Sequence, residues 1–288
     1  MITTDHLTKS YGHQRVVDDL SFTAPAGSVT AFLGPNGAGK STTMRMICAL
    51  ARPDSGAALV SGRPYTDLPH PGRVVGQLLD SSSLHRGRTG AEILRLALLT
   101  ADRPTSAGAE LLARVGLTDA ATKRVRAYSL GMRQRLGLAV ALAGEPEVLI
   151  LDEPFNGLDP EGIHWFRRVL RSFADDGGTV LLSSHLLAEV EAVADRYVVI
   201  AQGALVTQGT AQELLGDDST HADADDRPAL VSALTAAGWA VRESDSGVVV
   251  PATPAEVGRV AHAAGLPLTH LAPAGGGLED LFLQITAA

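Results

Sequence analysis

Cysteine is nearly absent from this sequence of 288 residues, and so are the long apolar runs that would place a chain across a membrane. The single Cys48 excludes an internal disulfide, and its place on the apolar side of a predicted helix favours core packing over a reactive thiol. The longest apolar runs, 136–143 and 148–151, fall well short of the roughly 18 residues that a membrane span needs. The first residues also lack the charged-then-apolar pattern of a signal peptide. We therefore expect a cytoplasmic protein that would reach a membrane only through a partner.

Basic runs are missing as well. The net charge is −8 and the pI about 5.6, which argues against nucleic acid as the main partner. Apolar residues make up 45% of the chain and charged residues 19%, as in globular proteins. The length suits one large domain followed by a small one.

The most informative stretch begins at Gly34 and has the spacing of a phosphate-binding loop, in which a glycine and four further residues precede Gly-Lys-Ser. A buried strand is predicted over 28–33 and a helix over 41–50, so the loop lies between the two elements that such a site needs. A glycine-rich turn could match by accident, but strand, loop and helix in this order favour the binding site. We expect the nucleotide to be bound by Gly34, Pro35, Asn36, Gly37, Ala38, Gly39, Lys40, Ser41 and Thr42.

The residue types in the loop explain its chemistry. Glycines let backbone N–H groups turn toward the β- and γ-phosphates, and the N-terminus of the helix adds partial positive charge. Lys40 supplies a full charge to the phosphate oxygens. The Ser41 hydroxyl can bind the magnesium ion that accompanies them.

Acidic residues follow the next predicted buried strand, 148–151. Asp152 lies at its C-terminal end, where ligands bind in open α/β sheets, and can hold magnesium through water. Glu153 is placed to polarise an attacking water. A solvated turn is the alternative for this pair. His185 follows a further strand, 179–183, and could reach the γ-phosphate, although a lone histidine is more often structural.

Tyr11 precedes a turn at Gly12, among residues 1–33, which are predicted as strands. An aromatic ring upstream of a phosphate loop can stack on a nucleotide base. It can equally pack against a hairpin, and the residues alone do not separate the two roles.

The remaining segments are organised around this core. A strand is predicted over 74–80, and helical periodicity runs from about 89 to 144, with Ser129 as the N-cap of the last helix. The acidic segment 216–227 shows no periodicity and is predicted as a linker. Residues 228–288 alternate helices and strands and end in an amphipathic helix carrying Leu278, Leu281, Phe282 and Ile285. No titratable cluster stands out there, so we predict a module for assembly more than for chemistry.

Residues 2–215 resemble the ATP-binding subunit of an ABC transporter. Besides the phosphate loop and the Asp-Glu pair, the stretch Tyr128-Ser129-Leu130-Gly131-Met132-Arg133-Gln134-Arg135 resembles the family signature, whose usual form is Leu-Ser-Gly-Gly-Gln. Ser129 and Gly131 match this form, whereas Leu130 and Met132 depart from it.

The resemblance implies a fold and a reaction. The fold would be α/β: a P-loop NTPase core with a parallel sheet, an N-terminal antiparallel β subdomain and a helical insert at about 81–144, within a domain of residues 1–215, followed by a small α+β module over 228–288. ATP would bind with Mg²⁺ and be hydrolysed. The implied catalytic residues are Glu153, His185 and Lys40, the metal ligands Ser41, Asp80 and Asp152, and the adenine-stacking aromatic Tyr11.

The resemblance also implies partners. Ser129, Gly131 and Met132 would contact the γ-phosphate of ATP bound by a second copy of the chain, and Asp159 would lie in the dimer-contact loop. Two ATP molecules would then be held between two chains. A separate membrane permease would receive the resulting movement at the cytoplasmic face of the membrane.

Asp80 stands where the family usually has a glutamine, four residues after the glycine of the strand that enters the helical insert. That glycine is Gly76, and Gln77 comes three residues too early to be the expected side chain. An aspartate keeps an oxygen for a metal but adds a charge. We hypothesise that Asp80 is a direct or water-bridged magnesium ligand.

This replacement, the signature variant and the ending at 278–282 resemble bacterial exporter ATPases of the antibiotic-resistance type. Export of a drug, antibiotic or other hydrophobic compound is therefore expected, and an importer ATPase stays possible because the permease sets the direction. A non-transport ATPase acting on ribosomes or nucleic acid would usually carry two ATP-binding halves or a long coiled-coil insert. A subunit with dead chemistry is disfavoured because Lys40, Asp152, Glu153 and His185 are all present.

Overall fold

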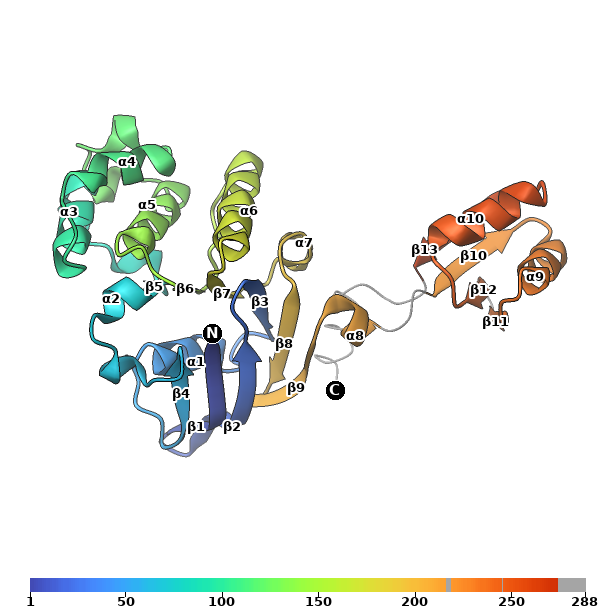
Figure 1. Cartoon of the computed structure of the whole chain (residues 1–288), viewed down its shortest axis with the longest axis horizontal. Helices are drawn as coiled ribbons and strands as arrows, with labels where there is room; N and C mark the ends of the chain where they lie inside the picture. The colour runs from blue at the N-terminus through green and yellow to red at the C-terminus, as the bar shows by residue number, and fades with distance from the viewer. Residues whose placement is uncertain (216–218, 245, 274–288) are drawn as a thin grey trace. The chain divides into compact units, whose positions relative to one another are not determined.

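The computed structural model describes residues 1–215, 219–244 and 246–273, and these separate into two compact units. The first unit ends at Gln208 and the second begins at Gly209, shortly before the boundary expected after residue 215. Figure 1 shows the order of the elements in each. Among the described residues, no helix combines the length and the hydropathy of a membrane span.

A six-stranded sheet forms the centre of the first unit, in the order β5-β6-β7-β3-β8-β9. Its pairs from β5 to β8 are parallel. The central strands β6, β7 and β3 are buried along their whole length, as their unbroken apolar runs predict. The bounds are β3 Ser28–Leu33, β5 Val75–Leu78, β6 Val148–Leu151, β7 Thr179–Ser183, β8 Arg196–Ala201 and β9 Ala204–Gly209.

A three-stranded antiparallel sheet, in the order β2-β1-β4, contributes the other half of the main core. Phe22 from this sheet stacks on Phe32 of β3 with ring centroids 5.2 Å apart, so the two sheets share one apolar interior. The N-terminal β subdomain implied by the resemblance is therefore present. Its strands are β1 Ile2–Tyr11, β2 Gln14–Ala24 and β4 Ser55–Val60.

The helical insert lies between β5 and β6 and groups together in green in Figure 1. Its first helix begins with a complete capping box between Thr89 and Glu92, and its last helix is capped by Ser129, as predicted. The helices are α3 Gly90–Thr100, α4 Ala107–Arg114 and α5 Leu130–Leu142, with 3₁₀ turns at Ser81–Ser83, Thr118–Ala120 and Val125–Ala127.

Other helices connect the sheet strands. The helix after the phosphate loop is shorter than the predicted 41–50, because Ala49 has a positive φ that ends it. No helix was predicted between the Asp-Glu pair and residue 179, yet a long amphipathic one lies there. The bounds are α1 Lys40–Ile47, α2 Pro71–Val74, α6 Pro160–Asp175 and α7 Leu187–Glu191, with a 3₁₀ turn at Tyr65–Asp67.

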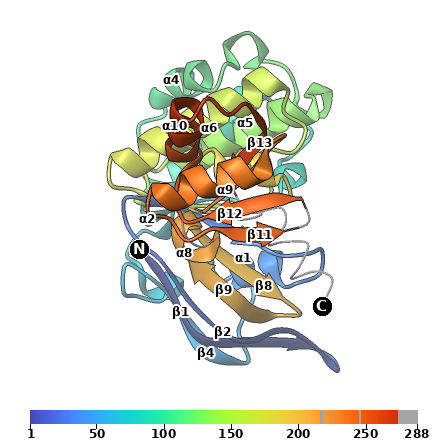
Figure 2. The same cartoon turned by 90° about the vertical axis from the view of Figure 1, so that its right-hand side faces the viewer.

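The second unit contains a βαββαβ arrangement with four antiparallel strands in the order β11-β12-β10-β13. This is the ferredoxin-like pattern. Figure 2 shows α9 and α10 together at this sheet, and their side chains build its small apolar core. After α8 Ala211–Leu215 the elements are β10 Thr220–Ala224, α9 Arg227–Ala236, β11 Arg242–Ser244, β12 Gly247–Val250, α10 Pro254–Ala263 and β13 Leu268–Pro273.

The predicted acidic linker is wrong over residues 220–224, which form the central strand β10. Thr220, Ala222 and Ala224 alternate inward with period two and are buried, while His221 and Asp223 take the other face. The alternation is weak in the sequence, because the inward side chains are small and the segment around them is acidic. Asp226, also assigned to the linker, caps α9. The predicted C-terminal helix at 278–285 lies outside the described residues.

Strand pairing also brings together titratable side chains that the sequence left apart. The imidazole rings of His221 and His270 lie with centroids 4.9 Å apart. His270 is paired with Asp223 across β10 and β13, and Asp223 is held by Arg227. This pairing could not be predicted from local sequence, because the residues come from opposite ends of the module.

Candidate nucleotide-hydrolysis site

The phosphate loop connects β3 to α1 and is shaped by its glycines. Gly37 and Gly39 have φ values of 83° and 101°, which only glycine adopts without strain. A Cβ on Gly34 would lie 2.4 Å from the Ile200 carbonyl oxygen of β8, so the loop can pass the sheet there only as glycine. The predicted strand, loop and helix are therefore all found in their expected order.

Lys40 opens α1 and is 8% exposed. Its ammonium donates hydrogen bonds to the carbonyl oxygens of Gly34 and Pro35, at 2.5 and 3.1 Å, so the loop closes on its own lysine. Burial lowers the pKa of Lys40, and the nearby carboxylates of Glu153 and Asp152 oppose that shift. The lysine is a desolvated cation facing two acids.

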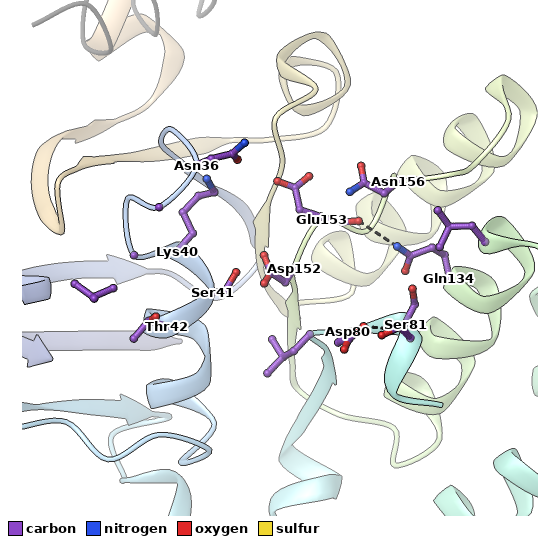
Figure 3. A pocket seen from close by; sticks show the side chains of 16 residues that line it. Asn36, Lys40, Ser41, Thr42, Asp80, Ser81, Gln134, Asp152, Glu153 and Asn156 are labelled. Atoms are coloured by element: carbon purple, nitrogen blue, oxygen red, sulfur yellow. Dashed lines mark hydrogen bonds between the residues drawn. The ribbon is translucent and has the colours of Figure 1, made fainter. Parts of the chain in front are cut away.

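A cavity of about 510 Å³ lies over the loop at the C-terminal end of the parallel strands. Figure 3 shows Lys40, Ser41, Asp152 and Glu153 facing this space from α1 and from the end of β6. Asn36, Gly37, Gly39 and Thr42 of the loop also line it, whereas Gly34, Pro35 and Ala38 do not. The cavity therefore gathers the loop and both acidic residues in one place.

Asp152 and Glu153 are linked to β7 by one hydroxyl. Ser183, which ends β7, donates a hydrogen bond to Asp152 Oδ1 at 2.5 Å and accepts one from the Glu153 N–H at 3.0 Å. Glu153 has a φ of 50°, a left-handed backbone that costs a non-glycine residue about 1–2 kcal/mol. Such strain persists only where neighbouring groups hold it.

His185 reaches the Glu153 side chain. Its Nδ1 lies 2.8 Å from Glu153 Oε2, and its backbone N–H donates to the same oxygen at 3.3 Å. The histidine side chain is 57% exposed and the carboxylate 25% exposed, so both can meet a ligand from the cavity side. The histidine does not itself line the cavity but orients the acid that does.

Asp80 lines the cavity and Gln77 does not, which agrees with the position that the family resemblance implied. The Asp80 carboxylate accepts a hydrogen bond from the Ser82 N–H at 2.7 Å and begins the 3₁₀ turn that follows. Hydrogen bonds from Ser82, with a smaller contribution from the charge of Arg45, lower the pKa of Asp80. A carboxylate that favours its ionised form therefore faces the same cavity as Ser41 and Asp152.

Ser129 accepts a hydrogen bond from the Met132 N–H at 3.1 Å, so the N-terminus of α5 is capped as predicted. A second hollow of about 330 Å³ lies beside it and is lined by Ser129, Gly131, Met132 and Asp159. Asp159 in turn caps α6 through the Gly162 N–H. The four predicted dimer residues therefore gather at one surface of the chain.

Tyr11 lies at the end of β1 and is 54% exposed. Its ring lies 5.4 Å from the Lys9 ammonium and does not line the cavity. Val16, across the hairpin on β2, is the residue of this subdomain that does. The stacking role of Tyr11 stays a prediction.

Residues 17–156 match the family model described as ABC transporter, and 219–279 match a domain of unknown function, DUF8746. The lantibiotic transport ATP-binding protein SrtF of Streptococcus pyogenes is 37% identical over 210 residues, covering 72% of this chain and 90% of the relative. The chain belongs to the ABC transporter ATP-binding proteins.

Two further similarities extend this result. The daunorubicin resistance ATP-binding protein DrrA3 of Streptomyces coeruleorubidus is 36% identical over 301 aligned positions, which cover 99% of this chain and 95% of the relative. A solved structure of the ATP-binding subunit of an ABC transporter superposes with a TM-score of 0.69 at 30% identity, over 74% of this chain and 91% of that one. The α/β fold expected from the resemblance is confirmed, and the chain is an ATPase.

The motifs of this ABC ATPase were predictable, but several residues around them were not. Val16 and Asn156 line the cavity, and Ser183 bonds both acids, without belonging to any recognised motif. Gln134 also lines the cavity, and it lies in the stretch 128–135 that resembles the signature, but no role was predicted for it. Val16, Asn156 and Ser183 reach the site only through the tertiary fold, which no local pattern predicts.

Proposed function

We propose that this ABC ATPase supplies the energy for export of a drug, antibiotic or similar hydrophobic compound through a separate permease. The single observation that carries the catalytic part is the Glu153 carboxylate, bonded to His185 and facing the same cavity as the phosphate loop. The export part is supported by the names of the relatives, which include lantibiotic transport and daunorubicin resistance.

In the proposed reaction, backbone N–H groups of the loop and Lys40 bind the β- and γ-phosphates. Binding moves the Lys40 ammonium from the Gly34 and Pro35 carbonyls to phosphate oxygens. Glu153 accepts a proton from a water whose oxygen attacks the γ-phosphorus in line, and ADP leaves with the electrons of the broken bond. His185 holds Glu153 and, with Lys40, stabilises the charge that develops on the transferred group.

The donor set around the cavity suits Mg²⁺. Ser41, Asp80 and Asp152 all offer oxygen, the ligand that this ion prefers. In the described part of the chain no three histidine, cysteine, aspartate or glutamate side chains form a metal cage. This fits an ion held by one or two carboxylates together with phosphates. When bound, the ion would neutralise charge on the phosphates.

A second copy of the chain is the proposed partner for hydrolysis. The surface formed by Ser129, Gly131, Met132 and Asp159 is separate from the chain's own nucleotide cavity, since only Leu130 of the signature lines that cavity. A helix N-terminus with a small hydroxyl residue suits a phosphate brought by another chain. We therefore propose a head-to-tail dimer that encloses two ATP molecules.

The permease would dock beside the helical insert, at the cytoplasmic face of the membrane. A groove of about 550 Å³ lies there, lined by the α2 segment, the edge strand β5 and one side of α3 and α5. Leu96 and Leu99 on α3 are 42% and 57% exposed, which leaves apolar surface next to the groove for a partner to cover.

Replacing the base tests the catalytic proposal. Glu153→Gln should bind ATP but lower turnover by roughly 10²- to 10⁴-fold, because it removes the proton acceptor and keeps the shape. ATP binding and phosphate release, measured on the purified chain, check this, and ATP should trap a dimer in light scattering. A variant that hydrolyses at the normal rate would remove Glu153 from this role.

Removing the charge at the metal site tests Asp80. Asp80→Asn keeps an oxygen but should weaken Mg²⁺ binding, and so raise the magnesium concentration needed for half-maximal turnover. Unchanged magnesium titration and turnover would end the proposed ligand role.

Co-purification tests the partner. A tagged chain isolated from its host in mild detergent should bring a polytopic membrane protein with it. Recovery of ribosomes or nucleic acid alone would leave the ATPase chemistry intact but attach it to another task.

A further inference from the structure

The peptide of Glu153 is bonded on both sides to side chains from elsewhere in the fold. Its N–H donates to Ser183 Oγ of β7 at 3.0 Å, and its carbonyl oxygen accepts from Gln134 Nε2 of α5 at 3.2 Å. The backbone between these two bonds has the positive φ of 50°. Within the turn itself the Asn156 N–H also donates to the Glu153 carbonyl, at 3.3 Å. That longer bond opposes the preference of a glutamate for negative φ only together with the two side chains.

Ser183 can serve Glu153 only as an acceptor. A hydroxyl has one proton, and that of Ser183 is donated to Asp152 Oδ1. Its remaining lone pairs face the Glu153 N–H. The serine is fully buried at the end of β7, so water cannot replace it. One hydroxyl thus sets the position of both acids relative to the sheet.

Gln134 is a buried amide that is only half satisfied. It is 4% exposed, and its Oε1 has no hydrogen-bond partner in the described part of the chain, although its Nε2 holds the Glu153 carbonyl. Figure 3 shows this bond at the cavity wall. A buried polar atom left unpaired opposes folding, so stability alone does not explain a glutamine here.

One face of α5 contacts the segment 153–159 at three positions. Gly131 approaches the Gly157 carbonyl so closely that a Cβ would lie 2.7 Å from it, and Arg135 lies 3.8 Å from Asp159. Gln134 makes the third contact. Positions 131, 134 and 135 have the i, i+3, i+4 spacing of one helical face. Helix α5, which begins within the signature stretch, and the segment 153–159 are therefore packed directly against each other.

We propose that Gln134 and Ser183 are positioning residues that together hold the Glu153 peptide in its strained conformation, and that Gln134 ties this peptide to the signature helix. A displacement of α5, at the surface that we propose meets a second chain's ATP, is thereby carried to Glu153 of the same chain. The inference rests on the proposed role of Glu153 as the base.

Replacing Gln134 tests this most directly, because it touches Glu153 but not Asp152. Gln134→Met keeps the length and burial of the side chain and removes the bond to the Glu153 carbonyl. The full chain should lose turnover roughly tenfold to hundredfold, as expected for a base displaced by about 1 Å, while the KM for ATP changes less than about twofold. Ser183→Ala should act in the same direction.

The double variant sharpens the test. Both substitutions release the same peptide, so their combined loss of turnover should be smaller than the product of the single losses. Thr30→Val is the matched control for Ser183→Ala. It removes a fully buried hydroxyl from the neighbouring strand β3, one with no partner in the described part of the chain, and should leave kcat and KM unchanged.

The outcomes separate this inference from the function on which it rests. If Glu153→Gln is inactive while Gln134→Met and Ser183→Ala keep normal kcat, the positioning role is wrong and the base stands. A raised KM with normal kcat would also overturn the inference, because it would place both residues in ATP binding. If Glu153→Gln is fully active, the proposed base itself is wrong.

Discussion

The two units of the chain treat buried polar groups differently. At the end of its parallel sheet the first unit buries Lys40, Gln134 and Ser183, and the glutamine leaves an amide oxygen unpaired. In the described core of the second unit the one buried polar side chain is Thr220, and its hydroxyl donates to the Ala252 carbonyl. In the first unit's site, local preferences for burial and hydrogen bonding are overridden, as is common where a protein carries out chemistry. In the second unit these preferences agree with the fold.

The same contrast appears in the backbone. Glu153 holds a positive φ beside the nucleotide cavity. In the second unit, α10 begins with a complete capping box between Thr253 and Glu256 and has Pro254 at its first position. We therefore expect substitutions in the first unit's site to change activity more than stability, and core substitutions in the second unit to do the reverse.

The largest effect should follow from Lys40→Met. Turnover should fall roughly 10²- to 10³-fold because the developing phosphate charge loses its cation. The melting temperature should not fall, because the substitution also relieves the burial of a charge, which lowers the pKa of Lys40. Phosphate release and thermal unfolding check the two halves. A clear loss of thermal stability would break the proposed division between the units.

Leu234→Ala should have the opposite profile. Leu234 is fully buried between the helices and sheet of the second unit, so its truncation should cost about 2–5 kcal/mol of that unit's unfolding free energy. ATP turnover of the folded chain should stay within about twofold of the wild type, because the cavity lies in the first unit. Denaturant unfolding followed by circular dichroism checks stability. A parallel loss of activity would show that the module supports the site.

The smallest effect concerns pH. Burial raises the pKa of the Cys48 thiol from 9.0 to about 12, so the folded state favours the neutral thiol. This contribution is complete below pH 9 and is lost as the pH rises toward 12. At pH 10.5, 1.5 units above the ordinary value, the wild type should have lost about 2 kcal/mol relative to its stability at pH 8 through this group.

Cys48→Ala is the control for that prediction. Its unfolding free energy should fall less between pH 8 and 10.5 than that of the wild type, as urea titrations at the two pH values would measure. Equal declines in the two proteins would assign the alkaline loss to other groups, such as the buried tyrosines.

Much of the first unit follows from local sequence. The runs that became β3, β6 and β7 are short, apolar and bounded by turns, so strand ends and the acids after them could be placed. The long helix α6 was missed although Asp159 caps it and Pro160 opens it. Phe166, Leu170 and Ala174 have helical spacing and are buried on one face of this helix, which is the signal that the sequence carries for it.

The rest depended on distant parts of the chain. Ser183 and Gln134 act on Glu153 across 30 and 19 positions of sequence, and no spacing rule links them. In β10 the inward residues are alanines and a threonine, whose weak apolarity was outweighed by the aspartates between them. Contacts between distant residues therefore limited the prediction of the site, and small inward side chains limited the prediction of β10.

The close passage of Gly131 over Gly157 has a consequence for sequence drift. The contact between these two segments is made by backbone at both positions, since a Cβ at Gly131 would strike the Gly157 carbonyl and one at Gly157 would strike Leu130. A library of single substitutions should therefore be depleted at 131 and 157. Met132, which stands where the family usually has a glutamine, lies outside this contact, so a substitution there should leave the packing of the two segments unchanged. A different side chain at 132 would change the lining of the second hollow but not the packing of α5 against the segment that carries Gly157.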